Sequence, residues 1–229
     1  MCGRYALTLP PAAVRAYFGY VDQPNFPPRY NIAPTQPIAI MRLEQGVRRF
    51  ALARWGFLPA FVKDPKDFPL ILNARAEGIA DKPSFRAAIR RRRCIVLADG
   101  FYEWRRLGKA RQPFLIRRPD GAPLAFAGLW EGWGAADGSE IDTACIITCG
   151  PNGVMAAIHD RMPVILPPEV FGLWLDPHAE GKDILPLLRP APDDDLELVA
   201  VSTAVNSVAN DGPALHERAP IRPPSRLVP

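Results

Sequence analysis

Cys2 is the residue whose position in this sequence most directly suggests chemistry. Removal of the initiator methionine before this small residue would leave a cysteine with both a thiol and a free α-amine. The α-amine has a reference pKa of about 7.7–8.0, so on the order of a tenth is neutral and nucleophilic at pH 7. Such an amine condenses with an aldehyde to an imine, and the adjacent thiolate can close onto the imine as a thiazolidine ring. Its position alone favours the simpler interpretation that Cys2 has no chemical role, so the case for a nucleophile depends on other residues.

Three further residues could take part in such chemistry. Glu103 stands within Phe-Tyr-Glu-Trp at residues 101–104, whose apolar bulk is expected to desolvate a carboxyl and favour its protonated form. Such a group can both accept and donate the protons that imine formation requires. His159 is a further candidate, because histidine is the side chain that most readily exchanges a proton near neutral pH. Each residue also has a structural interpretation: a solvent-facing strand position for Glu103, a capping role for His159 and a turn for Asn73.

The basic residues are unevenly distributed along the chain. Residues 1–118 carry 22 Lys and Arg against 8 Asp and Glu, whereas residues 119–229 carry 6 against 16. Most are arginines, whose planar fork binds phosphate bidentately. The basic first half therefore indicates a polyanion-binding face, unless the fold brings the two halves together and cancels their fields. The longest charged run, Arg90–Arg93, cannot lie on one helix face, and a solvated helix end explains it as well as a groove does.

Two other features bear on ligands. Trp55 stands between Arg54 and Gly56; a half-exposed Trp beside a cation suits base stacking, and core packing is the competing interpretation. Cys145 and Cys149 have a spacing that superficially suggests a metal pair, but they span a predicted strand, and no second Cys pair or suitably spaced His accompanies them. The sequence also lacks a Gly-rich nucleotide-binding pattern. We therefore expect no metal and no organic cofactor.

Short apolar runs bounded by Gly, Pro or Asp dominate the chain and are typical of strands. The predicted strands are Pro37–Leu43, Leu70–Leu72, Cys94–Ala98, Phe114–Arg117, Leu124–Leu129, Thr143–Thr148 and Leu196–Ser202. The abundant prolines argue against long helices, and the predicted helices are Pro11–Phe18, Ser84–Arg92, Asn152–Ile158 and Pro168–Leu175. These patterns predict one α+β domain with a curved, barrel-like antiparallel β core and a few short flanking helices.

Length and composition fit one globular domain. The chain has 229 residues, of which 48% are hydrophobic and 23% are charged, as in ordinary globular proteins. We assign residues 1–217 to this domain and the Pro/Arg-rich residues 218–229 to a tail. No apolar run approaches the length of a transmembrane span, and the first residues lack the apolar stretch of a secretion signal. We therefore expect a cytoplasmic protein whose four cysteines stay reduced.

Six segments taken together resemble one known family, the SRAP family of SOS response-associated peptidases, also called abasic-site processing proteins. The segments follow the family order from Cys2 to about Asn206, which is nearly the whole chain. Several long motifs in order are far more specific than one short pattern. The segments are Cys2–Tyr5, Tyr30–Gln36, Arg54–Phe57, Leu72–Glu77, Ala98–Trp104 and Ile158–Pro163.

The resemblance implies a role for each candidate catalytic residue. Cys2 matches the residue that is exposed by methionine removal and joined to the ring-opened abasic sugar. Asn73 matches a residue that positions the Cys2 amine, and Glu103 matches the acid and base that moves protons during imine and ring formation. His159 matches a residue that assists opening of the sugar ring.

The resemblance also implies a set of DNA contacts. Arg4, Arg75 and Arg161 match residues that contact phosphates or the DNA backbone. Trp55 and the loop from Asn31 to Pro34 look like elements that hold the flanking bases.

The function implied by the resemblance is recognition of abasic sites in single-stranded DNA and their covalent shielding as a thiazolidine on Cys2. An associated peptidase activity would remove the protein's own N-terminal segment. Two alternatives stay open: an N-terminal-nucleophile cysteine peptidase as the main role, and a non-catalytic module that binds single-stranded DNA. The expected partner is single-stranded DNA with abasic sites and not a membrane. We expect a monomer, and no partner among replication proteins can be identified from the sequence.

Overall fold

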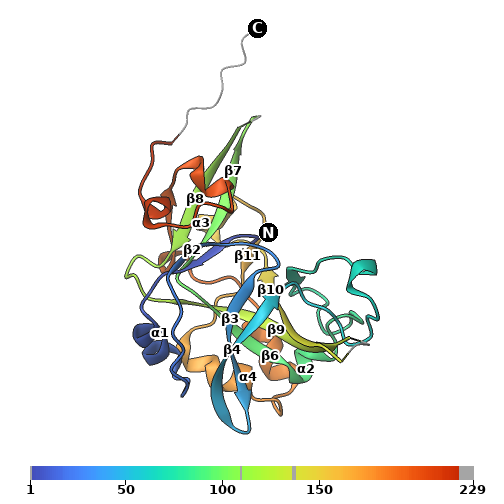
Figure 1. Ribbon diagram of the computed structural model, residues 1–229. Helices are drawn as coiled ribbons and strands as arrows, with labels where there is room; N and C mark the ends of the chain where they lie inside the picture. The colour runs from blue at the N-terminus through green and yellow to red at the C-terminus, as the bar shows by residue number, and fades with distance from the viewer. Residues whose placement is uncertain (1, 109, 136–137, 222–229) are drawn as a thin grey trace.

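Five strands close into a ring in the computed structural model, which describes residues 2–108, 110–135 and 138–221 (Figure 1). They are β3 (Pro37–Glu44), β4 (Val47–Trp55), β6 (Arg93–Ala98), β9 (Leu124–Gly134) and β10 (Glu140–Cys149). Hydrogen bonding runs in the order β10-β4-β3-β6-β9, and β9 pairs with β10 again. The predicted barrel-like core is therefore confirmed.

The ring closes through a parallel pairing, although only antiparallel pairs were expected. Thr143 and Ala144 on β10 lie opposite Arg54 and Trp55 on β4 in parallel register. The short β5 (Asn73–Arg75) also runs parallel to β10, whereas β11 (Met162–Pro163) pairs with β10 antiparallel. The barrel is therefore a mixed sheet, in which β10 connects strands that are far apart in sequence.

The close approach of the barrel strands depends on Gly128 in β9. A Cβ atom at this position would lie 2.9 Å from the sulfur of Cys94 on β6 and 3.1 Å from the carbonyl oxygen of Cys145 on β10. Separations this short leave no room for a side chain, so glycine allows β6 and β10 to flank β9 closely.

A second sheet is antiparallel throughout and has the strand order β12-β8-β7-β1-β2. Its strands are β12 (Glu197–Ala200), β8 (Ala110–Arg117), β7 (Gly100–Leu107), β1 (Tyr5–Leu7) and β2 (Arg29–Ile32). Only Asp99 separates β6 of the barrel from β7 of this sheet. The chain thus passes directly from one sheet to the other, and β7 and β8 project above the barrel in Figure 1.

Strand β4 was missing from the predicted strands because its sequence lacks a clear alternation of apolar and polar residues. It forms a hairpin with β3 across Gln45 and Gly46, whose φ angles are 49° and 78°. Two successive positive φ angles fit the right-handed twist of a hairpin. Gln45 is an unusual residue for such a turn, so the local sequence did not indicate a hairpin here.

The helices are short. Helix α1 (Pro11–Phe18) has the predicted bounds and ends at Gly19, which has a φ of 70°, as is common after a helix. Helix α2 (Ala88–Arg91) begins four residues later than predicted, and residues 84–87 form turns. Helix α3 (Gly153–Ala156) is capped by the Asn152 side chain.

The remaining helical segments lie in the second half of the chain. Helix α4 (Phe171–Leu175) follows a 3-10 turn over Pro168–Val170, so the predicted Pro168–Leu175 helix is split in two. Helix α5 (Gly181–Ile184) was not predicted. The other 3-10 turns cover Pro65–Asp67, Leu185–Leu187, Asp193–Asp195, Thr203–Asn206 and Pro213–His216. No helix among the described residues is long and apolar enough to span a membrane.

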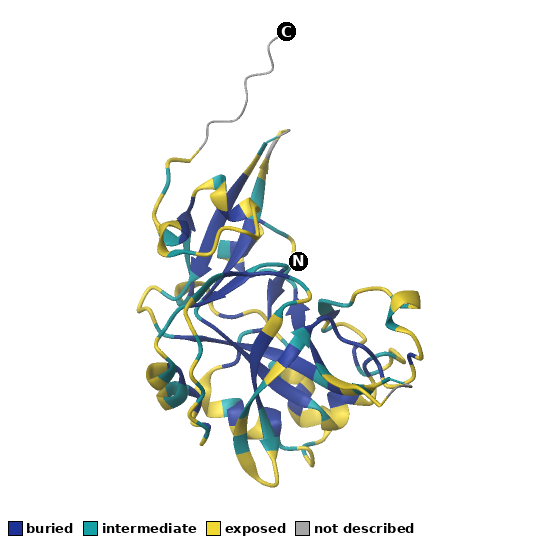
Figure 2. Cartoon of the chain, in the orientation of Figure 1, coloured by how far each residue is buried: buried dark blue, intermediate teal, exposed yellow. Residues whose placement is uncertain are grey.

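The main hydrophobic core fills the barrel and the space between the two sheets (Figure 2). Its largest fully buried side chains include Trp55, Trp174, Tyr5 and Phe126. Tyr102 and Leu115 belong to a smaller cluster, which also contains Val205 and Leu215 from the C-terminal segment. That segment therefore packs onto the second sheet.

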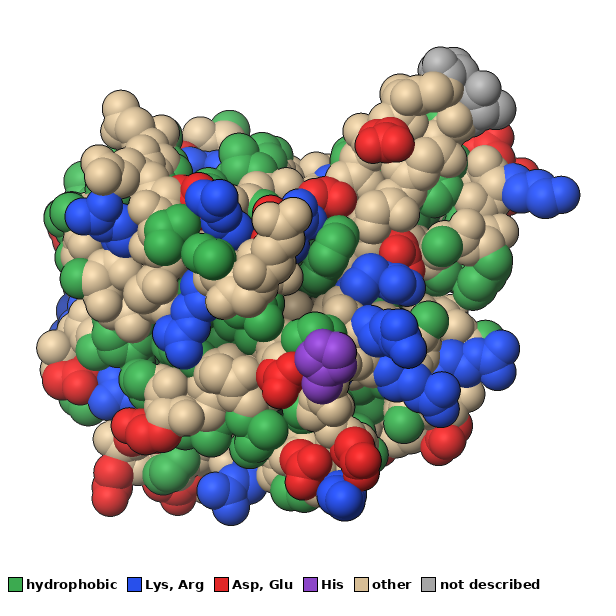
Figure 3. All heavy atoms as spheres, turned by 90° about the horizontal axis from the view of Figure 1, so that it is seen from below, with side chains coloured by type: hydrophobic (Ala, Val, Ile, Leu, Met, Phe, Trp, Pro, Cys, Tyr) green, Lys and Arg blue, Asp and Glu red, His purple; other side chains and the backbone are tan. Residues whose placement is uncertain are grey.

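The fold mixes the basic first half of the chain with the acidic second half. Six ion pairs among the described residues join arginines of residues 1–118 to acids of residues 119–229: Arg29–Asp211, Arg42–Asp142, Arg92–Glu131, Arg117–Glu197, Arg118–Asp120 and Arg118–Asp195. Figure 3 shows Lys and Arg side chains lying beside Asp and Glu side chains on one face, together with one group of adjacent basic side chains. Part of the charge asymmetry of the sequence is therefore offset by tertiary contacts.

Candidate active site

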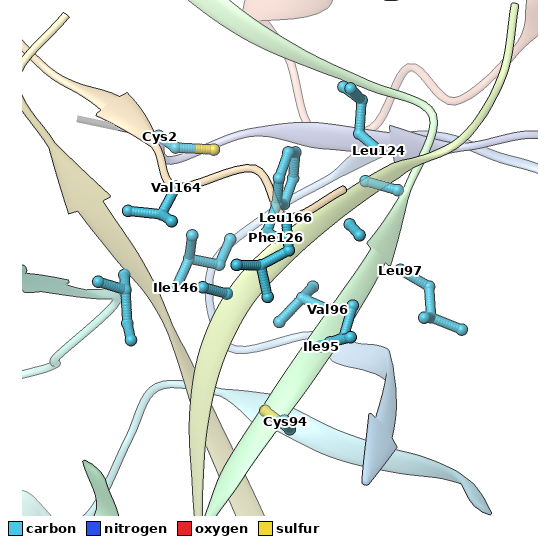
Figure 4. Packing of buried hydrophobic residues seen from close by; sticks show 14 of the residues in the cluster. Cys2, Cys94, Ile95, Val96, Leu97, Leu124, Phe126, Ile146, Val164 and Leu166 are labelled. Carbon is cyan, nitrogen blue, oxygen red and sulfur yellow. The ribbon is translucent and has the colours of Figure 1, made fainter. Parts of the chain in front are cut away.

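Cys2 lies between the barrel and the second sheet, next to Val164 at the edge of the hydrophobic core (Figure 4). It is fully buried. Its carbonyl oxygen accepts a hydrogen bond of 2.9 Å from the Nδ2 atom of Asn73. This contact joins the two residues that the sequence predicted to cooperate, although 71 positions separate them.

Asn73 is held by a strand and does not form a turn. It begins β5, where it lies opposite Ile146 of β10, and the flanking Leu72 carbonyl accepts a hydrogen bond from the Ile146 backbone nitrogen. Its side-chain Oδ1 atom is buried and has no hydrogen-bond partner among the described residues. The amide thus holds the Cys2 backbone with its nitrogen and keeps an acceptor oxygen available beside it.

Glu103 and His159 line one pocket of about 290 Å³ together with Gly3 and Arg4. Glu103 is 4% exposed and lies on β7, the strand that pairs with β1. His159 follows α3, and its side chain is 28% exposed. Its Nδ1 atom lies 2.9 Å from Asp160 Oδ1 and accepts a hydrogen bond of 3.0 Å from the Arg161 backbone nitrogen. A buried carboxyl and a partly solvated imidazole therefore face the same hollow, beside the residue that follows Cys2.

The electrostatics at Cys2 disfavour its thiolate. Burial raises the pKa of the thiol well above its ordinary value, and the negative charge of Glu103 raises this pKa further. The Glu103 carboxylate is therefore close enough to Cys2 for their charges to interact. A thiol with a raised pKa is a weak nucleophile at neutral pH.

Arg4 is positioned by a buried network. One of its guanidinium nitrogens donates to Asn31 Oδ1 and to the Val205 carbonyl, both at 2.8 Å. Asn31 is 1% exposed, and its Nδ2 atom donates to the carbonyls of Val205, Ser207 and Asn210. The side chain of Asn31 is thus buried and bonded within the protein in this conformation, and a contact of its loop with flanking bases stays a prediction. Its role is to fix Arg4 against the C-terminal segment.

Trp55 also departs from its predicted role. It is fully buried, its ring packs edge-on against Tyr5 at a centroid separation of 5.3 Å, and its indole nitrogen donates to the Leu72 carbonyl at 3.0 Å. The structure thus places Trp55 in the core, as the competing interpretation expected, and its ring is not exposed for base stacking in this conformation. The bond to Leu72 fixes the residue that precedes Asn73, so Trp55 supports the site from within.

The remaining predicted DNA contacts have different surroundings. Arg161 forms a bidentate ion pair with Glu77, at 2.8 and 2.9 Å, and donates to the Thr148 carbonyl. The same guanidinium lowers the pKa of the Glu77 carboxyl. Arg75 is exposed beside it, and Pro34 is half-buried in the turn that follows β2. Arg75 and Pro34 can thus meet a ligand directly, whereas Arg161 would have to exchange a partner.

The Arg90–Arg93 run does not form one basic surface. Arg93 is 3% exposed, and its guanidinium donates to four carbonyls, those of Ile89, Arg90, Trp174 and Asp176. Arg92 pairs with Glu131 at 2.6 Å. The run therefore fastens α2 and α4 to the barrel, and only Arg90 and Arg91 are exposed.

Three residues of the site were not predicted. Trp104, Arg106 and Arg111 line the same pocket as Glu103 and His159. Trp104 is half-buried, and its indole nitrogen donates to Asn206 Oδ1 at 2.8 Å. A hairpin signal at residues 100–117, with arginines on both strands, could have indicated Arg106 and Arg111.

The cysteines of the barrel lie away from this pocket's lining. Cys94, Cys145 and Cys149 are buried and form no disulfide bonds. The described residues contain no group of three or more His, Cys, Asp and Glu side chains that could hold a metal ion.

Comparison with protein families gives a match over residues 1–208 to the model described as SOS response associated peptidase (SRAP). The chain belongs to this family. The abasic site processing protein YoqW of Bacillus subtilis is 40% identical over 222 residues, which cover 95% of this chain and 99% of YoqW. The abasic site processing protein HMCES of Xenopus tropicalis is 31% identical, over 93% of this chain and 77% of HMCES.

The fold of this SRAP chain is shared with solved structures. A crystal structure of a protein from Bacteroides thetaiotaomicron superposes with a TM-score of 0.86 at 27% sequence identity, covering 95% of this chain and all of that one. A protein from Bordetella bronchiseptica gives a TM-score of 0.77 at 30% identity, covering 88% of this chain. The fold of this chain therefore recurs in these two solved structures.

Proposed function

We propose that this SRAP protein recognises abasic sites in single-stranded DNA and links to them covalently through Cys2 once Met1 has been removed. The observation that carries the proposal is the hydrogen bond from Asn73 to the Cys2 carbonyl, beside a pocket lined by Glu103 and His159. The relatives named abasic site processing proteins support the same substrate.

The reaction begins at the amine, because the thiol has a raised pKa. The neutral α-amine of Cys2 adds to the aldehyde of the ring-opened sugar and gives a carbinolamine. Loss of water then gives an imine. The thiol adds across the C=N bond, forming a C–S bond while its proton goes to the nitrogen, and a thiazolidine results.

Each polar residue of the site has a task in this sequence. The free Asn73 Oδ1 atom can accept a hydrogen bond from the Cys2 amine and so orient its lone pair. Glu103 accepts a proton from the attacking amine and returns it to the departing water. His159 assists opening of the closed sugar, since its imidazole lies at the partly exposed side of the pocket, where it can exchange a proton with the sugar.

The decisive test is denaturing gel electrophoresis with a single-stranded oligonucleotide that contains one abasic site. The wild-type protein is expected to give a shifted band that resists denaturant and heat, and intact mass should show that active protein begins at Cys2. Cys2→Ala should give no such band. Cys2→Ser should give at most a labile adduct, because serine keeps the amine but closes the ring poorly. A heat-stable adduct of Cys2→Ala at wild-type yield would contradict the proposal.

A cysteine peptidase that uses the same Cys2 is the second candidate, and the family description favours it. Amide hydrolysis needs the thiolate, whose formation the burial of Cys2 and the charge of Glu103 oppose. Selective methylation of the α-amine separates the two activities. It should abolish the DNA adduct and leave a thiol-dependent peptidase active.

A further inference from the structure

Two arginines face each other directly across the β7–β8 hairpin. Arg106 and Arg111 are paired in the antiparallel register of these strands. Both side chains are exposed, and neither forms an ion pair with any described residue. Like charges that lie directly opposite on a sheet are destabilising. The hairpin therefore carries a local energetic cost that the rest of the described protein does not relieve.

The position of this pair is informative. Arg106 and Arg111 both line the pocket that contains Glu103 and His159. Arg106 also lines an adjoining hollow of about 410 Å³ with Trp104, His159 and Asp160. The hollows share Trp104, Arg106 and His159, so Arg106 lies where the reaction pocket opens outward.

Other arginines near this pair already have partners within the protein. Arg4 is bonded to Asn31 and Val205, and Arg105 lies over the Phe114 ring at 5.0 Å from its centroid. Arg117 pairs with Glu197 at 2.7 Å. Arg106 and Arg111 thus offer two guanidinium groups at the pocket that form no ion pair with the described part of the chain.

We propose that Arg106 and Arg111 form a phosphate clamp, which binds the backbone phosphate of a nucleotide flanking the abasic site. This inference rests on the proposed function for the identity of the DNA. A phosphate between the two guanidinium groups would accept bidentate hydrogen bonds and screen their mutual repulsion. The arrangement is a positioning device: it holds the strand so that the abasic sugar enters the pocket of Glu103 and His159.

The clamp is tested first by equilibrium binding to an oligothymidine single strand without an abasic site. Arg106→Ala and Arg111→Ala should each weaken binding about tenfold, since a charge-assisted hydrogen bond is of that size. Each should also reduce the magnitude of the log–log salt slope by about 0.7. Affinity within twofold of wild type for both variants would overturn the proposal.

Charge reversal separates a functional role from a structural one. Arg111→Glu would place a carboxylate opposite Arg106 and convert a repulsive cross-strand pair into an attractive one. The melting temperature should stay level or rise, by up to about 4 °C, while affinity for the oligothymidine falls at least tenfold. A fall in affinity with a lowered melting temperature would assign the two arginines a structural role instead.

Arg91→Glu is the matched control. Arg91 is also exposed, but it belongs to α2, at the far end of the barrel from the β7–β8 hairpin (Figure 1). It should change affinity much less than Arg111→Glu does. Equal losses would mean that overall charge is responsible, which would overturn the clamp.

The kinetics of adduct formation test whether the clamp acts in DNA binding or in the chemical step. On an abasic single strand, Arg106→Ala should raise the DNA concentration that gives half-maximal adduct rate, and the rate at saturating DNA should change little. A lowered saturating rate with normal half-saturation would contradict a positioning role. If the wild-type protein forms no adduct, the proposed function fails, but the binding measurements still decide whether the clamp exists.

Discussion

Glu103 is nearly buried on β7, so its replacement by glutamine removes a titratable oxygen with little change in shape. If Glu103 moves protons during imine formation, Glu103→Gln should slow adduct formation by about 10²–10⁴-fold. Binding to unreactive single strands should stay close to wild type. Single-turnover rates at saturating DNA measure the effect, and a wild-type rate would remove Glu103 from the chemistry.

His159 lies at the partly exposed side of the same pocket, which suits a role in opening the closed sugar. His159→Ala should react slowly with a natural abasic site, by about 10²-fold or more. It should recover on an oligonucleotide that already presents an open aldehyde. Equal defects on the two substrates would show that the assigned role is wrong.

At the scale of single elements, β5 depends on Trp55. Trp55→Phe removes the hydrogen bond to the Leu72 carbonyl and leaves space in the core. The free energy of unfolding should fall by about 2–3 kcal/mol. Affinity for single-stranded DNA, measured per folded molecule, should stay within about twofold of wild type. Urea unfolding and fluorescence anisotropy test the two parts, and normal stability with weak binding would restore the stacking interpretation.

The C-terminal segment is held to the second sheet in part by His216, whose ring packs edge-on against Tyr30 at a centroid separation of 4.9 Å. Burial lowers the pKa of His216; Asp99 raises it and Arg117 lowers it. The unfolded chain therefore binds this proton more readily than the folded one. Stability should fall as the pH drops through the ordinary histidine pKa of about 6.5 toward the lower folded value.

His216→Phe keeps the aromatic packing and removes the titration. It should flatten the part of the stability profile between pH 7 and pH 5 that belongs to this residue. Denaturant unfolding across this range measures the slope. The same slope in the variant as in wild type would assign the pH dependence to other groups.

At the scale of the whole molecule, ion pairs between the two halves neutralise part of the charge pattern of the sequence. A few unpaired arginines near the pocket remain, among them Arg106 and Arg111. Three to five phosphate contacts should give a log–log salt slope of about −2 to −3.5 for single strands. A slope near zero, or tighter binding to intact duplex, would argue against an arginine-lined path for the DNA.

The sequence by itself identified the family, named the candidate catalytic residues and indicated much of the secondary structure. Cys2, Asn73, Glu103 and His159 stand in long motifs whose order identifies the SRAP family. The apolar runs at residues 94–98, 124–129 and 143–148 became β6, β9 and β10 because a buried strand shows its character in a few consecutive residues.

Only the tertiary structure decided which side chains are available. Trp55 and Asn31 read as ligand contacts in the sequence but are buried by strands and segments distant along the chain. Arg106 and Arg111 became prominent only through their pairing across a hairpin. Burial, ion pairing and barrel closure depend on contacts between residues far apart in sequence. Those contacts cannot be inferred from local composition and spacing.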